Sequence, residues 1–398
     1  MLVGAISIII GYLLGSVSPS FILGKLLKGI DIREHGTKNA GATNTKKVLG
    51  LGPAIICAIY DLSKGLLAMW LAHKLGASPI IMYAASYAAI LGHVFPFYLG
   101  FRGGQGVATA VGILFYNLFL LLSKNFLPSE DLLVLSILVL GLLYITKEGE
   151  VIGIVALPGF AYFMFKNYPL NIVTITTAII IFYILFINIF NIYKQKLFKL
   201  KPKFHKKVRL WRLLSRPAAL VFPILLMNFD KKISLIVIGS VLLIFGIWDI
   251  VRLIHSRVNV FFFLTKPGIF KESEESKFSS MTLFLLASFL ITLIFAKPIA
   301  VTALVFLIFG DMFSKFFGIQ YGRTKIFHKT LEGTIAYFIV CFVAGYFLLD
   351  YFPDLSLNVI LIGSLVAALT ELLPLGVDDN LTVGIVSAGM MFLVQKII

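Results

Sequence analysis

Apolar runs of about 17–25 residues recur along the whole chain, and each is long enough to cross a bilayer as a helix. The composition agrees, because 59% of the 398 residues are hydrophobic and only 14% are charged. A soluble domain usually has about 45–50% apolar and about 25% charged residues, and a membrane β-barrel would show short alternating segments instead. The sequence therefore predicts an all-α, polytopic integral membrane protein.

The apolar runs predict about 14 spans in two groups. A segment with ten Lys or Arg residues and no acid, 194–216, separates the groups and is expected to be a solvated linker on the cytoplasmic side. We therefore expect two helical-bundle domains, residues 1–200 and 201–398, with no repeat relating them. A second, mixed-charge loop is expected at 265–280. The expected spans lie near 2–24, 51–74, 80–99, 106–123, 131–146, 149–165, 171–193, 216–228, 233–254, 281–296, 298–317, 334–350, 357–375 and 381–397.

The net charge of +16 would suggest nucleic acid as a partner of a soluble protein. In a membrane protein, basic loops set the topology and contact anionic lipids. No basic face with interleaved aromatic residues is visible, so membrane lipids and not nucleic acid are the expected partners. Cys57 and Cys341 lie in apolar runs and are expected to pack there, since two distant cysteines support neither a metal site nor a disulfide framework. Residues 1–24 have no basic start and are expected to be a retained first span.

Residues 33–47, REHGTKNAGATNTKK, form a polar segment that cannot lie in hydrocarbon. Its glycines allow tight turns and close approach to a ligand, and backbone N–H groups in such turns form anion-binding concavities. Hydroxyl, amide and cationic side chains next to them would complete a phosphate site. The candidate residues in this segment are Arg33, Gly36, Thr37, Lys38, Asn39, Gly41, Asn44 and Lys47.

Residues 92–109, GHVFPFYLGFRGGQGVAT, have the same character. Arg102 and the glycines lead into an apolar helix from Val107, and backbone donors at a helix N-terminus beside a guanidinium suit phosphate. Glycines in membrane proteins also serve packing and hinges, so this segment alone leaves both interpretations open. The candidate residues here are His93, Arg102, Gly103, Gly104, Gln105 and Gly106. His93 either donates to a phosphate or caps a helix.

Asp61 and Lys64 lie three residues apart near the start of the second span, at helical spacing. One interpretation is a buried pair that neutralises itself. The other is that Lys64 reaches the polar pocket and that Asp61 orients it, since ionisable groups inside spans are functional candidates.

Residues 1–200 resemble the integral-membrane acyl-phosphate:glycerol-3-phosphate acyltransferase family. The resemblance rests on DIREHGTKNAGATNTKKVLG, DLSKG and GHVFPFYLGFRGGQGVATAVG, in that order. It implies acyl transfer from acyl phosphate to the 1-hydroxyl of glycerol 3-phosphate, giving lysophosphatidate at the cytoplasmic face of the cell membrane, without metal or CoA. With it we predict Thr37, Asn39, Lys47, His93 and Arg102 as catalytic residues. The other candidates named above, together with Lys64 and Asn191, are predicted to bind substrate.

The chain departs from the family pattern at several of these positions. The family prefers Ser where Thr37 keeps the hydroxyl, and Arg where Lys47 keeps the charge but loses the bidentate fork. Gln105 replaces a cation. The third family motif reads NIFNIYKQKL here, with Asn188 at its His position, Phe190 at its Glu position and Asn191 retained. An alternative is therefore that the first half is a non-catalytic lipid-binding scaffold.

The second half holds two polar segments, GDMFSKFFGIQYGRTKIFHKTLEGT (310–334) and TELLPLGVDDNLTVG (370–384). Carboxylates beside cations and glycines are what nucleotide phosphates with bridging Mg²⁺ require, and oxygen-rich ligands suit Mg²⁺ better than Zn²⁺. Simpler interpretations remain open. Asp311 and Lys315 have the spacing of an intrahelical ion pair, and residues 378–380 fit a turn that caps a helix.

The order of these motifs resembles the CTP-dependent dolichol and phytol kinase family, related to phosphatidate cytidylyltransferases, over about residues 205–398. The resemblance implies phosphate transfer from CTP to a lipid alcohol, with Asp311 also catalytic, and with Asp311 and Asp379 as Mg²⁺ ligands. Cytidylyl transfer is less expected, because KTLEG and DNLTV follow the kinase pattern. The predicted binding residues of this half are Gly322, Arg323, Lys325, Lys329 and Glu332.

A fused, bifunctional lipid enzyme is therefore the favoured hypothesis, and a transporter of anionic solutes is the alternative from another class. Transporters commonly have related halves and a site at the bilayer midplane. Here the halves are unrelated and the polar clusters lie at the ends of spans, so the sequence favours the enzyme.

Overall fold

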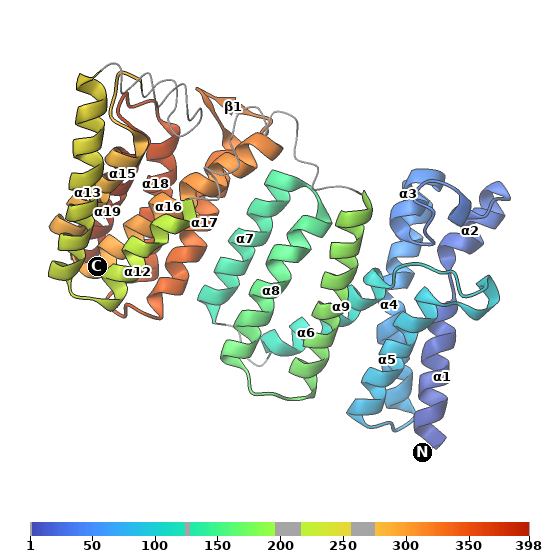
Figure 1. Ribbon diagram of the computed structural model, residues 1–398. Helices are drawn as coiled ribbons and strands as arrows, with labels where there is room; N and C mark the ends of the chain where they lie inside the picture. Colours follow the sequence, from blue (N-terminus) through green and yellow to red (C-terminus); the bar gives the residue numbers. More distant parts are fainter. Residues whose placement is uncertain (1, 124–127, 196–215, 256–274, 398) are drawn as a thin grey trace. The chain divides into compact units, whose positions relative to one another are not determined.

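The computed structural model describes residues 2–123, 128–195, 216–255 and 275–397. Residues 196–215 of the predicted linker and 265–274 of the predicted mixed-charge loop lie outside the described residues. Within the described part, the regular structure is helical apart from one two-stranded hairpin, β1 (Lys325–Ile326) and β2 (Lys329–Thr330) (Figure 1).

Ten helices in the described ranges are long and apolar enough to cross a membrane, and four more are apolar but only 10–17 residues long. The prediction of a helical, multi-pass integral membrane protein is confirmed. The predicted number of about 14 spans is not established. An α-helix of 18 residues rises about 27 Å, close to the hydrocarbon thickness of about 30 Å, and the four shorter helices fall below that length.

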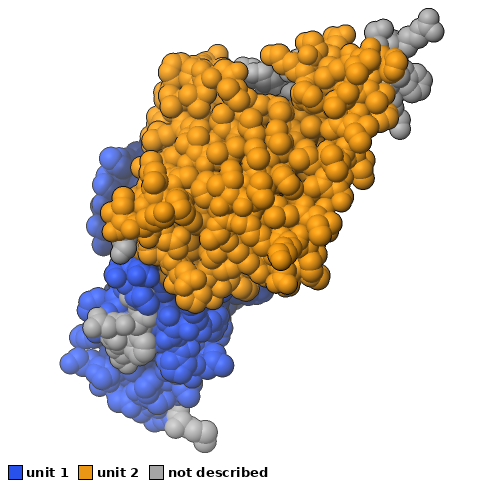
Figure 2. Space-filling model, turned by 90° about the vertical axis from the view of Figure 1, so that its left-hand side faces the viewer, with its two compact units in different colours: residues 1–132, 149–197 blue, residues 133–148, 198–398 orange. Residues whose placement is uncertain are grey.

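The chain forms two compact units, residues 1–132 with 149–197, and residues 133–148 with 198–398 (Figure 2). The main division follows residue 197, and the expected domains 1–200 and 201–398 stay a prediction. The helix α7 (Ser129–Thr146) crosses the division, because its residues from 133 onward belong to the second unit.

In the first unit, α1 packs on α4 and α5, α4 packs on α6, and α9 packs on α6 and α8. Two short 3₁₀ turns, η1 (Ile32–Glu34) and η2 (Phe97–Leu99), shape the loops between them. The helices of this unit, besides the start of α7, are α1 (Leu2–Ser16), α2 (Pro19–Lys28), α3 (Ala42–Leu49), α4 (Leu51–Lys74), α5 (Pro79–Val94), α6 (Val107–Ser123), α8 (Gly149–Asn167) and α9 (Ile172–Gln195).

Helices α1 and α5 approach each other along a row of small residues. A Cβ added at Gly11 would collide with the carbonyl of Ala85, and one added at Gly15 would collide with the carbonyl of Ala89. Small residues let membrane helices come this close, and such packing matters because lipid gives no hydrophobic drive for helices to associate. The contact fixes the C-terminal end of α5, where His93 lies, against the end of α1.

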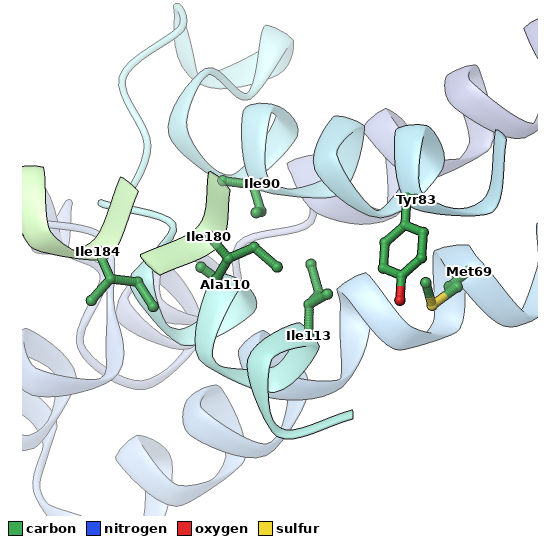
Figure 3. Close-up of a cluster of buried hydrophobic side chains, with 7 residues drawn as sticks. All are labelled: Met69, Tyr83, Ile90, Ala110, Ile113, Ile180 and Ile184. Atoms are coloured by element: carbon green, nitrogen blue, oxygen red, sulfur yellow. The ribbon is translucent and has the colours of Figure 1, made fainter. Parts of the chain in front are cut away.

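A buried apolar cluster joins α4, α5, α6 and α9 (Figure 3). Its members are Met69, Tyr83, Ile90, Ala110, Ile113, Ile180 and Ile184. The hydroxyl of Tyr83 donates to Asn117 Oδ1 at 2.7 Å, and Asn117 Nδ2 donates to Thr177 Oγ1 at 2.9 Å. These buried polar groups are therefore satisfied, and the start of α9 is fixed against the second half of α6.

In the second unit, α16 packs against α12, α15, α17, α18 and α19. Tyr337 donates its hydroxyl to the carbonyl of Phe306 at 3.1 Å. Cys341 is buried in this unit and Cys57 in the first, both as free thiols, as expected. The elements, besides the end of α7 and the hairpin, are η3 (Arg216–Leu220), α12 (Val221–Asn228), α13 (Lys231–Ile254), α15 (Ser280–Ile294), α16 (Lys297–Tyr321), α17 (Leu331–Leu349), α18 (Leu357–Leu372) and α19 (Asp379–Ile397).

The close approach of α1 and α5 predicts the effect of adding one methyl group. Gly11→Ala should lower the stability by about 1–3 kcal/mol, because the added Cβ overpacks the contact with Ala85. Gly52→Ala adds the same methyl to a helix where nothing lies within 4 Å, and should leave the melting temperature in detergent unchanged or higher. Equal melting temperatures for the two variants would contradict the packing.

Candidate functional site

Arg33 joins the two polar segments of the first unit. Its Nη1 donates to the carbonyl of Leu99 and to that of Arg102, both at 2.8 Å. The rest of the guanidinium is held by Asp31, with Nη2 2.7 Å from Asp31 Oδ2, and Nε donates to Asp31 Oδ1 at 3.0 Å. The ring of Phe21 lies 5.2 Å below the guanidinium carbon. Arg33 therefore ties residues 31–34 to residues 99–102.

The Asp31–Arg33 pair is only partly exposed, and each partner shifts the pKa of the other. Hydrogen bonding from the Arg33 side chain holds the pKa of Asp31 below its ordinary value of 3.8, against the opposing effect of burial. Hydrogen bonding to Asp31 likewise raises the pKa of Arg33. Arg33 was predicted to bind phosphate. The structure gives it a structural role as well, because most of its donors are used by Asp31 and by the two carbonyls.

Asn44 organises the backbone of the first segment. Its Oδ1 accepts the backbone N–H of Thr37 at 2.7 Å, and its Nδ2 donates to the carbonyls of Ile32 at 2.8 Å and His35 at 3.0 Å. Gly36 adopts φ +60° directly over this amide, where a Cβ would collide with Asn44 Oδ1. Asn44 is 1% exposed and makes three hydrogen bonds within the loop, so it shapes the turn.

The remaining predicted residues of this segment surround the turn at the surface. Thr37, Lys38 and Lys47 are exposed, and Asn39 and Gly41 are half-buried. Lys38 has φ +59°, the left-handed conformation that is uncommon outside glycine. Among the predicted residues of the first segment, the structure therefore leaves the side chains of Thr37, Lys38 and Lys47 open to solvent.

The second segment folds back on the end of α5. The N–H of Gly103 donates to the carbonyl of Val94, and the N–H of Gly104 donates to the carbonyl of His93, both at 3.0 Å. A Cβ on Gly104 would collide with His93 Nε2 and would lie 2.6 Å from the carbonyl oxygen of Ala40. Gly104 thus marks the place where the two segments and the His93 ring meet. The Arg102 side chain is exposed.

Gln105 and Asn191 form a reciprocal amide pair. Gln105 Nε2 donates to Asn191 Oδ1 at 2.6 Å, and Asn191 Nδ2 donates to Gln105 Oε1 at 3.0 Å. The hydroxyl of Tyr183 also donates to the Gln105 carbonyl at 2.7 Å. Both amides were predicted as site residues from separate motifs, and the structure brings them together. The anchoring by Tyr183 has no signal in the sequence.

Asp61, Lys64 and His93 form one buried polar cluster. Lys64 Nζ lies 2.9 Å from Asp61 Oδ1 and donates to the carbonyl of Gly15 at 3.1 Å. It also contacts His93 Nδ1, which lies 3.3 Å from Asp61 Oδ1. The predicted pair of Asp61 and Lys64 is therefore present, and His93 joins it from α5.

The two segments therefore carry exposed cations, and a buried, hydrogen-bonded imidazole lies at their junction. Lys38, Lys47 and Arg102 supply positive charge. Helix α6 begins at Val107, and His93 Nε2 lies at the junction of the two segments. Such an arrangement suits organic phosphates, because oriented N–H groups and cations stabilise anionic oxygens.

In the second unit, Lys329 links three elements. Its Nζ lies 2.9 Å from Glu371 Oε1 at the end of α18 and 2.8 Å from Asp379 Oδ2 at the start of α19. Ser314 of α16 donates its hydroxyl to Glu371 Oε1 at 3.3 Å. The other oxygen of Glu371 is buried and makes no hydrogen bond within the described residues. Glu371 belongs to the oxygen-rich segment 370–384 that the sequence singled out as suited to Mg²⁺, whereas Ser314 was not predicted.

Glu332 closes the turn that precedes the hairpin. It is fully buried and accepts the backbone N–H groups of Arg323 at 3.0 Å and Thr324 at 3.2 Å. Arg323 Nε lies 3.3 Å from Glu332 Oε1. Glu332 therefore has a structural role, while Arg323 and Lys325 keep exposed side chains beside the half-buried Gly322.

The predicted Mg²⁺ ligands are each ion-paired with a lysine. Asp311 Oδ1 lies 2.8 Å from Lys315 Nζ, as the spacing predicted, and Asp379 is paired with Lys329. No group of three or more His, Cys, Asp or Glu residues in the described part is placed to hold a metal ion. Mg²⁺ is usually bound by one or two carboxylates together with substrate phosphates, and Asp311 and Asp379 could bind it in that way.

Comparisons with known proteins point to the first unit. A family described as glycerol-3-phosphate acyltransferase matches residues 5–195. A glycerol-3-phosphate acyltransferase of Shouchella clausii is 53% identical over 116 residues, which are 29% of this chain and 57% of that protein. That of Blochmanniella pennsylvanica is 35% identical over 173 residues, which are 44% of this chain and 85% of that protein.

The chain spans about half the length of several curated relatives that it matches, between 51% and 57% of them. Among solved structures, it is similar to PlsY, an integral membrane glycerol 3-phosphate acyltransferase, in its glycerol 3-phosphate form. The identity is 28%, the TM-score is 0.38, and the match covers 48% of this chain and 92% of that one.

The Asp31–Arg33 pair predicts a pH-dependent stability difference. Asp31→Asn should lower the stability at neutral pH by about 1 kcal/mol, because it removes the carboxylate that holds Arg33. Since the pKa of Asp31 is lowered by folding, this contribution is present above about pH 3.8 and is lost as the pH falls through the lowered value.

Thermal unfolding of the wild type, Asp31→Asn and the neighbouring exposed control Glu34→Gln should be followed from pH 7 to the lowest tolerated pH. The wild type and Asp31→Asn should converge in acid, and Glu34→Gln should differ little from the wild type at any pH. A difference that persists unchanged below the lowered pKa would contradict the pairing.

Proposed function

Because the chain belongs to the glycerol-3-phosphate acyltransferase family, we propose that its first unit transfers an acyl group from acyl phosphate to glycerol 3-phosphate, giving lysophosphatidate. The observation that carries the proposal is the junction made by Arg33, which brings two Gly- and cation-rich segments together over the buried His93 cluster.

The proposed reaction needs positioning and charge more than covalent help from the protein. A bond forms between the 1-hydroxyl oxygen and the acyl carbon, the bond from that carbon to the phosphate oxygen breaks, and the hydroxyl proton leaves on the phosphate. The acyl donor is already activated, so the site must hold two phosphates and align the hydroxyl with the carbonyl. Lys38, Lys47 and Arg102 are the exposed cations for that task.

Thr37 and Asn39 are proposed to orient the substrates from the turn that Asn44 shapes. The backbone N–H of Thr37 is already used by Asn44, so the Thr37 contribution comes from its exposed hydroxyl. Gly36, Gly41, Gly103 and Gly104 let the backbone approach the phosphates. The basic residues of both segments support a cytoplasmic location for the proposed site, because cytoplasmic loops carry an excess of Lys and Arg.

Acyl transfer should be measured on the purified full chain with radiolabelled glycerol 3-phosphate and palmitoyl phosphate. Lys47→Ala and Arg102→Ala should each lower the rate on the order of 10²–10³-fold, as for the loss of one charge-stabilising donor. Lys74→Ala is the matched control, because it removes an exposed cation from the far end of α4, and should retain the wild-type rate.

Folded wild-type protein that forms no lysophosphatidate, or the same rate in all three variants, would contradict the acyltransferase. Either result would favour the alternative, in which the first unit binds lipid for the second without catalysis. Turnover with acyl-CoA but not acyl phosphate would correct the donor.

For the second unit, we propose phosphorylation of a lipid alcohol by CTP. The specific observation in favour is the convergence of Lys329, Glu371 and Asp379 from the hairpin, α18 and α19. Asp311 and Asp379 would hold the Mg²⁺ that accompanies the nucleotide and offsets the charge of its phosphates. Arg323, Lys325 and Lys329 are the cations proposed for the triphosphate, with Gly322 in the turn beside them.

Kinase activity should be tested with CTP labelled at the γ-phosphate and with polyprenol, phytol or diacylglycerol as acceptor. Lys329→Met should abolish phosphorylation, because it removes the cation between two carboxylates. Lys396→Met, at the opposite end of α19 and exposed, is the control and should keep full activity. Absence of labelled lipid with every acceptor, from protein with an unchanged melting temperature, would contradict the kinase.

A further inference from the structure

Lys64 uses all three of its ammonium hydrogens inside the protein. An ammonium group has three donors and no acceptor. Its three neighbours are the Gly15 carbonyl at 3.1 Å, Asp61 Oδ1 at 2.9 Å and His93 Nδ1. The side chain is fully buried, so Lys64 has no donor left for a substrate. It differs in this respect from the exposed cations Lys47 and Arg102.

The three contacts decide which ring nitrogen of His93 carries the hydrogen. Because Lys64 can only donate, the Nδ1 atom that faces it must accept, and the hydrogen of the neutral ring then lies on Nε2. The opposite arrangement would have Nδ1–H donate to Asp61 Oδ1, 3.3 Å away. It would point that hydrogen toward an ammonium group and leave one Lys64 hydrogen without an acceptor in a buried site.

The Nε2 side of the ring faces the junction of the two polar segments. This atom occupies the space that a Cβ on Gly104 would need, beside the carbonyl of Ala40. Within the described residues, the polar contacts of the His93 ring, to Lys64 Nζ and to Asp61 Oδ1, are both made by Nδ1. The ring keeps 7% of its surface exposed. Nε2–H is therefore a free donor at the site.

We propose that Lys64 and Asp61 are positioning residues that lock His93 in the Nε2–H form. His93 then donates a hydrogen bond to an anionic oxygen of a bound organic phosphate and does not act as the base for the attacking hydroxyl. This inference rests on the proposed acyltransferase function for the identity of the phosphate. The lock itself rests on the geometry of the three side chains.

Lys64 thus acts on the substrate through His93. Asp61 holds Lys64 in place and neutralises it, which is required because an unpaired charge inside a span is costly. Gly104 has to be glycine, because any side chain there would displace the imidazole.

The tautomer should be read directly by ¹⁵N NMR of the full chain labelled at histidine. The chain has six histidines, and the His93 signals are those lost in His93→Gln. In the wild type they should show a bare Nδ1 and a protonated Nε2. In Lys64→Met, which keeps the length of the side chain, the bare and protonated nitrogens should exchange or average. A wild-type ring with bare Nε2, or with both nitrogens protonated, would overturn the proposal.

The rate of acyl transfer provides a second test, because a purely structural role of His93 would not make His93→Gln and His93→Leu differ in rate. His93→Gln keeps an N–H donor near the position of Nε2, whereas His93→Leu keeps only bulk. With a donor role, His93→Gln should retain at least tenfold more acyl transfer than His93→Leu, at similar melting temperatures. If His93 were the base, both variants would lose activity equally, and that result would overturn the proposal.

The two failures are distinguishable, because the NMR measurement needs no turnover. Adding glycerol 3-phosphate to the wild type should shift the His93 Nε2 signal. The signal should not shift in the double variant that carries both Lys47→Ala and Arg102→Ala. If His93 has the expected tautomer but the protein transfers no acyl group, the inferred positioning of His93 stands and the proposed reaction is contradicted.

Discussion

The site of the first unit depends on the hydrogen bonds from Arg33 to the carbonyls of Leu99 and Arg102. The two polar segments lie some sixty residues apart in the chain, separated by the helices α4 and α5. A planar guanidinium presents donors on several sides at once, so one side chain binds Asp31 and both carbonyls. Without this junction, the cations of the two segments would lie on separate loops. With it, the segments that carry Lys38, Lys47 and Arg102 meet at one place.

Two buried ion pairs lie inside the described spans. Lys64 pairs with Asp61, and Arg252 pairs with Asp249, whose second oxygen accepts the Ser279 N–H at 2.7 Å. Removing one partner from such a pair leaves an uncompensated charge, which costs more than the pair itself contributes. The two pairs differ in what surrounds them. Asp249 is satisfied by the next helix, whereas the Lys64 group ends at His93, which faces the junction.

The sequence predicts the helical spans and both polar segments well, because long apolar runs and clustered glycines and charges are local signals. It does not predict how donors are distributed once the segments meet. Arg33 and Asn44 look like phosphate ligands in the sequence, yet most of their donors are spent on carbonyls of the protein. That outcome depends on tertiary contacts that no spacing within one segment can reveal.

The same limit applies to the second unit. The spacing of Asp311 and Lys315 left an intrahelical pair open as the simpler alternative to a Mg²⁺ site, and the structure contains that pair. The hairpin of β1 and β2 has no periodic pattern, because each strand is only two residues long. The bridging of Glu371 and Asp379 by Lys329 joins residues about fifty positions apart, so it too depends on how α18 and α19 pack against α16.

The structure gives a physical reason for one departure of the chain from the family pattern, Gln105. Gln105 stands where the family resemblance places a cation, and its amide both donates to and accepts from Asn191. A lysine at that position has donors but no acceptor, so it would leave Asn191 Nδ2 without this partner. The exchange therefore keeps the loop attached to α9 and removes one charge from the proposed phosphate site. Charge stabilisation then falls on Lys38, Lys47 and Arg102, which are exposed and are screened by water until substrate covers them. Under the proposed function, the first unit therefore relies on these three cations together with the His93 donor, whose ring is 7% exposed.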